Sequence, residues 1–149
     1  MIVLMAGYYA LPVSFVENSF VRFFAVVPGS FFIDLITPDT EVSANGTRIV
    51  SNIAKLNVLK GCEGTEALLI LYSAIIATLR PLKISIIGIV IGTVIVFLLN
   101  QFRITALFFI AAYHRSAFEV VHGLLAPLII IAITGLFFML WHKHSLASR

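Results

Sequence analysis

Long apolar runs dominate this chain and limit what it can fold into. The longest covers residues 84–113 and is interrupted only by Asn100, Gln101 and Arg103. About 20 predominantly apolar residues are enough for a helix to cross a bilayer. Hydrophobic residues make up 60% of the 149 positions and charged residues 11%, which is typical of an integral membrane protein. We therefore expect an all-α membrane fold, a polytopic transmembrane helix bundle of about four spans with a small exterior β-hairpin element.

The N-terminal part carries two apolar stretches of different character. Residues 2–16 predict a first membrane helix, which is short for a full span and lacks the basic start and cleavage site of a signal peptide. Residues 21–36 are interrupted by Pro28, Gly29 and Ser30. Such a break is typical of a re-entrant or interfacial segment rather than of a second clean span.

Three further apolar runs predict the helices of the bundle, and they cover residues 65–79, 84–113 and 123–141. In the second of them, the four-residue spacing of Gly88 and Gly92 favours close helix packing. The predicted organisation has three parts: an N-terminal membrane helix with a broken or interfacial segment (1–36), an exterior β-element (37–61), and a transmembrane bundle with the candidate catalytic residues (62–149).

Residues 37–64 form the one polar stretch between the apolar runs. Asn45 and Gly46 stand between short β-forming sequences, and Asn-Gly favours a hairpin turn because both turn positions need a positive φ. Residues 51–60 can add another short strand. The tripeptide that begins at Asn45 also matches the N-glycosylation pattern, but the turn explains these residues equally well.

Basic residues predict the orientation in the membrane. Arg80 and Lys83 lie between two predicted spans, and Lys143 and Arg149 follow the last one. Lys and Arg gather in cytoplasmic loops, so both clusters are expected in the cytoplasm and residues 17–66 outside it. We expect a multi-pass protein of the plasma (inner) membrane with its candidate site facing the exterior or periplasm.

This orientation places three chemically capable residues at one membrane face. Cys62, the single cysteine, comes three residues before the outer end of the predicted helix 65–79, and His122 directly precedes the last helix. Arg103 lies 19 residues beyond Ile84, or about 29 Å along a helix, close to a full hydrocarbon thickness. All three are therefore expected near the outer boundary.

A thiol, an imidazole and a guanidinium are the parts of a cysteine acyl-transfer site. Cys62 would be the nucleophile, with a pKa lowered by the nearby helix start. His122 would act as general base and acid, and Arg103 would stabilise the oxyanion. The alternatives are an inert interfacial cysteine, a helix-flanking histidine, and an arginine that reaches the lipid headgroups or pairs with Glu66.

Three more residues complete the candidate set. Glu66 could orient His122 or pair with Arg103, although a carboxylate beside a thiolate would raise the thiol pKa. Asn100 could hydrogen-bond in the same network. His114 lies on the predicted outer side and is the reserve for the general base.

Composition also excludes several kinds of site. One cysteine rules out an internal disulfide and a metal site built of cysteines. The basic residues are scattered and form no stripe, so a nucleic-acid partner is not expected. We expect no cofactor and no metal, and the lipid bilayer is the one partner that composition alone implies.

Three segments together resemble the exosortase/archaeosortase family. They are the heptapeptide from Gly61 to Ala67 (Gly-Cys-Glu-Gly-Thr-Glu-Ala), the segment from Asn100 to Ile104 (Asn-Gln-Phe-Arg-Ile), and His122 before a final apolar helix. The first segment resembles one of the smaller bacterial subtypes. The resemblance covers about residues 49–141. Many members of the family have about twice as many spans.

The resemblance implies a membrane cysteine protease, thought to act as a transpeptidase. Its expected substrates are membrane proteins with a C-terminal sorting signal made of a short motif, one helix and a basic tail. Cys62 would attack, His122 would transfer the proton and Arg103 would hold the oxyanion.

Two other classes of function are alternatives to this reading. In a non-enzymatic polytopic membrane subunit, Arg103 would pair with a partner helix and the hairpin would dock an exterior protein. A further membrane subunit is thus left open as a partner. A transporter fits poorly, because the polar residues gather at one face and not at the membrane midplane.

Overall fold

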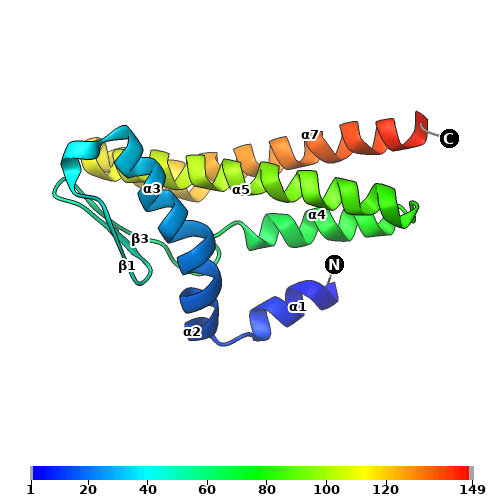
Figure 1. The fold of residues 1–149 in the computed structure, drawn as a ribbon, viewed down its shortest axis with the longest axis horizontal. Helices are drawn as coiled ribbons and strands as arrows, with labels where there is room; N and C mark the ends of the chain where they lie inside the picture. The colour runs from blue at the N-terminus through cyan, green and yellow to red at the C-terminus, as the bar shows by residue number, and fades with distance from the viewer. Residues whose placement is uncertain (1, 148–149) are drawn as a thin grey trace.

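The protein is a bundle of helices with a small sheet at one end (Figure 1). The computed structural model describes residues 2–147, so Arg149 of the predicted basic tail lies outside the described residues. Helices α4 (Thr65–Ala77), α5 (Leu82–Tyr113) and α7 (Ala126–Ala147) pack against one another. The short helix α1 (Ile2–Ala10) contacts α4.

Three helical stretches are long and apolar enough to cross a membrane, and they cover Val13–Ile36, Leu82–Tyr113 and Arg115–Leu146. The last consists of η3 (Arg115–Ala117), α6 (Phe118–Val120), η4 (Val121–Leu125) and α7. Helix α4 has 13 residues and so measures about 20 Å, less than a hydrocarbon core of about 30 Å. The prediction of an all-α membrane fold with a small β-element is confirmed, with three full-length spans and one short helix in place of about four spans.

The N-terminal helices differ from the predicted pattern. The first helix ends at Ala10, and Pro12 takes an extended conformation (ψ 134°) that separates α1 from the next helix. From there α2 (Val13–Val16), the π-helical segment η1 (Glu17–Val26) and α3 (Val27–Ile36) follow without interruption. The predicted break at residues 28–30 was therefore wrong.

A side chain of α5 supports the helix beside Pro28. Proline has no N–H, so a carbonyl of the turn before it is left without a helical donor. This turn belongs to the π-helical segment, and Gln101 Nε2 donates to its Phe24 carbonyl at 2.7 Å. Gly29 then lets α3 approach α5, because a Cβ at this position would lie 2.9 Å from Ile104.

The polar segment forms a three-stranded antiparallel sheet in the order β1 (Ser43–Asn45), β2 (Arg48–Val50), β3 (Lys55–Asn57). The hairpin and the third strand were predicted, but the turn comes one residue later than expected. Asn45 pairs with Arg48, so the two turn residues are Gly46 and Thr47. Of these, Gly46 has the positive φ (60°), and Thr47 does not.

The glycine pair of α5 accommodates side chains from neighbouring helices. A Cβ on Gly88 would lie 2.5 Å from the Trp141 indole, and one on Gly92 would lie 2.4 Å from Leu71. The close packing that the spacing predicts is therefore present, with large side chains seated against the glycines.

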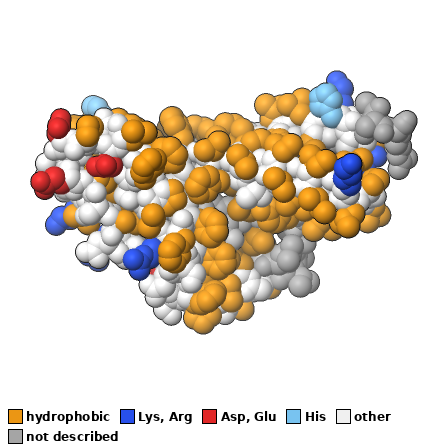
Figure 2. Space-filling view, viewed as in Figure 1, with side chains coloured by type: hydrophobic (Ala, Val, Ile, Leu, Met, Phe, Trp, Pro, Cys, Tyr) orange, Lys and Arg blue, Asp and Glu red, His pale blue; other side chains and the backbone are white. Residues whose placement is uncertain are grey.

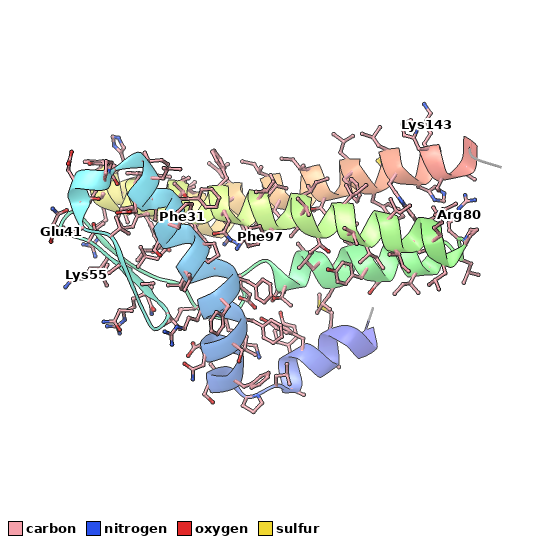
Figure 3. All side chains as sticks on the ribbon, viewed as in Figure 1. Phe31, Glu41, Lys55, Arg80, Phe97 and Lys143 are labelled. Carbon is pink, nitrogen blue, oxygen red and sulfur yellow. The ribbon has the colours of Figure 1, made fainter. Side chains whose placement is uncertain are left out.

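Charged side chains gather at the two ends of the bundle, and hydrophobic ones cover the middle (Figure 2). Arg80 and Lys143 lie at one end, and Glu41 and Lys55 at the other (Figure 3). The apolar band between them is the surface expected in contact with lipid. One buried cluster links the N-terminal helices, the sheet and α5, so the three predicted parts of the chain share a core.

Candidate active site

Cys62 lies in the loop that connects β3 to α4. Two glycines shape this loop, because Gly61 has a φ of 95° and Gly64 a φ of 84°, values that side-chain-bearing residues rarely adopt. Helix α4 begins at Thr65 with Gly64 as its N-cap. Cys62 therefore precedes the helix and is not part of its first turn.

The Cys62 Sγ atom contacts the imidazole of His122. Sγ and Nε2 are 3.4 Å apart, although the two residues are 60 positions apart in the sequence. His122 lies in the π-helical segment η4. The Phe118 ring stacks on the imidazole, with 5.5 Å between the ring centroids and an interplanar angle of 7°. This stacking holds the imidazole in a fixed orientation toward the thiol.

Arg103 comes from α5 and reaches the same site. Its Nη2 donates to the backbone carbonyl of His122 at 3.4 Å. Its Nε is buried, and within residues 2–147 it has no hydrogen-bond partner. Leaving a buried donor without a partner costs about 1–3 kcal/mol, so the binding of an acceptor to this N–H is favourable.

The three side chains line one cavity of about 340 Å³. Its other walls come from β3 and the segment that follows it, from α5, and from α6; they include Asn57, Lys60, Leu107, Phe118 and Glu119. The structure thus brings Cys62, Arg103 and His122 together at a space that a substrate carbonyl could enter.

The environment of Cys62 keeps its thiol protonated. Burial raises the pKa of the Cys62 thiol above its ordinary value, Arg103 opposes this, and the carboxylates of Glu63 and Glu66 add to it. The expected lowering by the helix start was wrong, because Cys62 lies before α4 and is partly buried. A thiol of this kind needs a base to become a nucleophile, and His122 Nε2 is in contact with it.

The two supporting residues have different surroundings from those expected. Glu66 accepts a hydrogen bond from the Tyr9 hydroxyl, and among the described residues no hydrogen bond or ion pair joins it to His122 or Arg103. Asn100 is only 1% exposed and lies against Gly64, where a Cβ would be 3.3 Å from its Cγ. Neither end of its amide has a hydrogen-bond partner in the described part of the chain.

Helix α1 holds the cysteine loop in place, a feature that sequence reasoning missed. Tyr8 donates to the buried carboxylate of Glu63, which also accepts from the Gly61 amide at 2.7 Å. Lys60 donates to the carbonyls of Tyr8 and Leu11 and lies 4.9 Å from the Tyr8 ring centroid. The polar residues beside Cys62 were the available signal, but nothing in the sequence connected them to α1.

The remaining histidines lie elsewhere. His114 follows the last residue of α5 and is exposed, and His142 stacks on Phe138 in the last turns of α7. Within residues 2–147, no group of three His, Cys, Asp or Glu side chains is placed to hold a metal ion.

Comparison with known proteins identifies the family. No curated protein and no solved structure matches the chain. A family model described as transmembrane exosortase matches residues 1–141 of the 149. This match agrees with the resemblance that the Cys62, Arg103 and His122 segments carry, and it extends to the N-terminal helices. The chain is therefore a member of the transmembrane exosortase family.

Proposed function

We propose that this chain is a membrane-embedded cysteine protease/transpeptidase that cleaves C-terminal sorting signals of surface-destined proteins on the outer face of the plasma (inner) membrane. Family membership supports a protease or transpeptidase role and membrane-protein substrates in general. The contact of 3.4 Å between Cys62 Sγ and His122 Nε2 carries the proposal for the site. It brings a nucleophile and a base together within one cavity.

In the first step, His122 Nε2 takes the proton of the Cys62 thiol as sulfur attacks the scissile carbonyl carbon. The carbonyl π electrons move to oxygen and form a tetrahedral oxyanion. When it collapses, the C–N bond breaks and the imidazolium gives its proton to the leaving amine. A thioester on Cys62 remains. Water or an amine then attacks the thioester carbonyl, and His122 again accepts the proton of the nucleophile. The C–S bond breaks to give an acid or a new amide, and the imidazolium returns its proton to the Cys62 thiolate.

Arg103 is proposed to stabilise the oxyanion. Its buried Nε has no acceptor in residues 2–147, and its Nη2 is anchored on the His122 carbonyl. A fixed cation aimed at developing negative charge lowers the barrier without reorganisation during the reaction. Asn100 is proposed as a positioning residue, because it lies against Gly64 beside the nucleophile loop.

Charge distribution supports the outward orientation of the site. Arg80 and Lys143 lie at the end of the bundle away from the sheet (Figure 3). By the positive-inside rule this end faces the cytoplasm. The sheet and the cysteine loop that follows β3 then face the exterior.

The test is processing of a co-expressed membrane protein that ends in a helix and a basic tail. Wild-type chain should give a shorter product, and Cys62→Ala should give none at equal membrane abundance. A product from wild type, together with a hydroxylamine-sensitive adduct on Cys62, would establish the acyl-enzyme. His114→Ala is the matched control, since this histidine lies at the end of α5 without contact to the thiol, and it should process normally. Normal processing by Cys62→Ala would contradict the proposal and favour a non-enzymatic membrane subunit.

A further inference from the structure

Strand β3 has hydrogen-bonding groups that its own sheet does not use. In an antiparallel ladder, hydrogen-bonded residue pairs alternate with pairs whose backbone groups point outward. The Val58 amide donates to the Thr47 carbonyl at 2.9 Å, and the Ser51 amide donates to the Ala54 carbonyl at 3.0 Å. These two pairs flank β3 and fix the alternation along it.

The outward positions of β3 follow from this alternation. Leu56, which pairs with Ile49, directs its N–H and C=O toward β2. Lys55 and Asn57 therefore direct theirs to the opposite side. β3 is an edge strand in the order β1-β2-β3, so this side of the strand is not covered by another strand of the sheet. An unpaired edge is a template for another extended chain.

The free edge borders a groove that leads to the thiol. A cavity of about 590 Å³ lies between β3 and the end of α5 with the short helices that follow, and it is lined by Lys55, Asn57, Ala111 and Arg115 among others. It shares Leu56, Asn57, Phe118 and Glu119 with the cavity that contains Cys62 and His122. The two cavities are therefore adjacent, and we refer to them together as the passage.

We infer that the scissile segment of the substrate binds in extended form along β3, as a fourth strand of the sheet. This inference rests on the proposed function, because it assigns the passage to the peptide that Cys62 cleaves. The free N–H and C=O groups of Lys55 and Asn57 pair with the peptide backbone. Five positions separate Asn57 from Cys62, and the chain turns between them, because the Cys62 amide donates to the Leu59 carbonyl at 3.0 Å. The peptide therefore has to cover less than the roughly 17 Å of five extended residues.

The chemistry of the edge selects this occupant over others. A helix satisfies its backbone groups internally and offers none to a strand edge. A lipid chain has no donors at all. An extended peptide supplies alternating N–H and C=O groups at the spacing of the strand. Its carbonyl carbons are accessible to the thiol, because no helix has to unfold first.

Proline at Asn57 tests the edge without damaging the sheet. Asn57→Pro removes the outward N–H but leaves the hydrogen bonds to β2, and edge strands tolerate proline at such positions. Asn57→Ala keeps the N–H and loses the same side chain, including its bond with Thr47. Ala44→Pro is the second control. Ile49 directs its backbone groups toward β3, so its partner in β1, Ala44, forms a pair without hydrogen bonds and directs its N–H away from the sheet at the other free edge.

The experiment measures binding of the substrate separately from its cleavage. The full chain carries Cys62→Ala and a photoreactive benzoylphenylalanine in place of Arg115, which lines the groove opposite β3. The probe is a co-expressed reporter membrane protein with a C-terminal helix and basic tail. We expect Asn57→Pro to lower the captured reporter about 3- to 10-fold relative to Asn57→Ala, the effect of one lost backbone hydrogen bond, with Ala44→Pro at the parent level.

Each outcome decides the inference. Equal capture by Asn57→Pro and Asn57→Ala overturns strand addition, and so does absence of capture while the wild-type chain still processes the reporter. In both cases the proposed protease function stands. Processing that does not depend on Cys62 overturns that function instead. If thermal melting shows that Asn57→Pro does not fold, Lys55→Pro against Lys55→Ala makes the same comparison at the other outward position.

Discussion

Gln101 Nε2 lies 2.7 Å from the carbonyl oxygen of Phe24, in the helical turn before Pro28, a residue that has no N–H of its own. The two residues are 77 positions apart in the sequence and belong to different helices. This bond joins the N-terminal span to α5 two residues before Arg103. Gln101, one of the three polar residues that interrupt the longest apolar run, therefore has a structural contact, whereas Arg103 is proposed to be catalytic.

Gln101→Leu should destabilise the protein without touching the thiol. The carbonyl of Phe24 would lose its donor in an apolar setting, at a cost of about 1–3 kcal/mol. Thermal unfolding in detergent measures the loss. Ser73→Ala is the control, because its hydroxyl bonds a carbonyl of the preceding turn, Leu69, and its removal should change the melting temperature little. Equal melting temperatures for Gln101→Leu and wild type would contradict the account of Pro28.

The pH at which Cys62 reacts with an alkylating agent should respond to nearby charges. Burial raises the thiol pKa and Arg103 lowers it, so half-maximal alkylation is expected above the pH of an exposed cysteine. Arg103→Ala should move the profile to higher pH, and Glu66→Gln, which removes a raising charge, to lower pH. Stopped-flow labelling at a series of pH values measures both. Shifts of the same sign would contradict this electrostatic picture.

Arg103→Ala should lower kcat for signal cleavage about 100- to 1000-fold, the usual effect of losing an oxyanion donor. Arg103→Lys keeps the charge but not the fork of N–H donors and should recover only part of the rate. Single-turnover cleavage of a reporter in proteoliposomes gives the rates. A change in KM alone would indicate that the arginine binds substrate without stabilising the transition state.

Gly64→Ala should impair both stability and cleavage, whereas Gly46→Ala should affect stability alone. Both glycines have positive φ, so either substitution carries a strain of about 1–2 kcal/mol. A Cβ on Gly64 would also meet Asn100 at 3.3 Å, but one on Gly46 would meet nothing within 4 Å. Melting temperatures and reporter cleavage compare the pair. Full cleavage by Gly64→Ala would show that the cysteine loop tolerates displacement.

Tyr8→Phe should release α1 from the cysteine loop. Removing the hydroxyl that bonds the buried Glu63 is expected to cost about 1–3 kcal/mol. Hydrogen exchange should rise in α1 and in residues 59–64. Tyr9→Phe serves for comparison because Tyr9 is 58% exposed, and the loss of its bond to Glu66 should have a smaller effect. Unchanged exchange in Tyr8→Phe would mean that α1 is held by its apolar contacts.

Patterns that depend on local chemistry were predictable from the sequence. The length of the apolar runs predicted the membrane fold, and the stretch around Gly46 predicted the hairpin. The order of Cys62, Arg103 and His122 gave the family, which the match over residues 1–141 confirms. Their catalytic roles stay a prediction, although the structure places the three side chains at one cavity.

Features that depend on distant partners could not be predicted. Pro28 and Gly29 are typical helix breakers in the sequence, but in the fold Gln101 bonds a carbonyl of the turn before Pro28 and Ile104 fills the space beside the glycine. The pKa of Cys62 was misjudged for a similar reason. Proximity to a helix start is visible in the sequence, but burial and the surrounding carboxylates are properties of the assembled fold.

The distance of 60 positions between Cys62 and His122 sets an order of events during biosynthesis. The thiol emerges from the ribosome well before the imidazole, and α4 and α5 can be inserted while the thiol still has no base. Until the helix that carries His122 has packed beside α5, the thiol has no contact with the imidazole. The proposed chemistry therefore becomes possible only in the completed bundle, and any chain cut short before His122 carries the thiol without its proposed base.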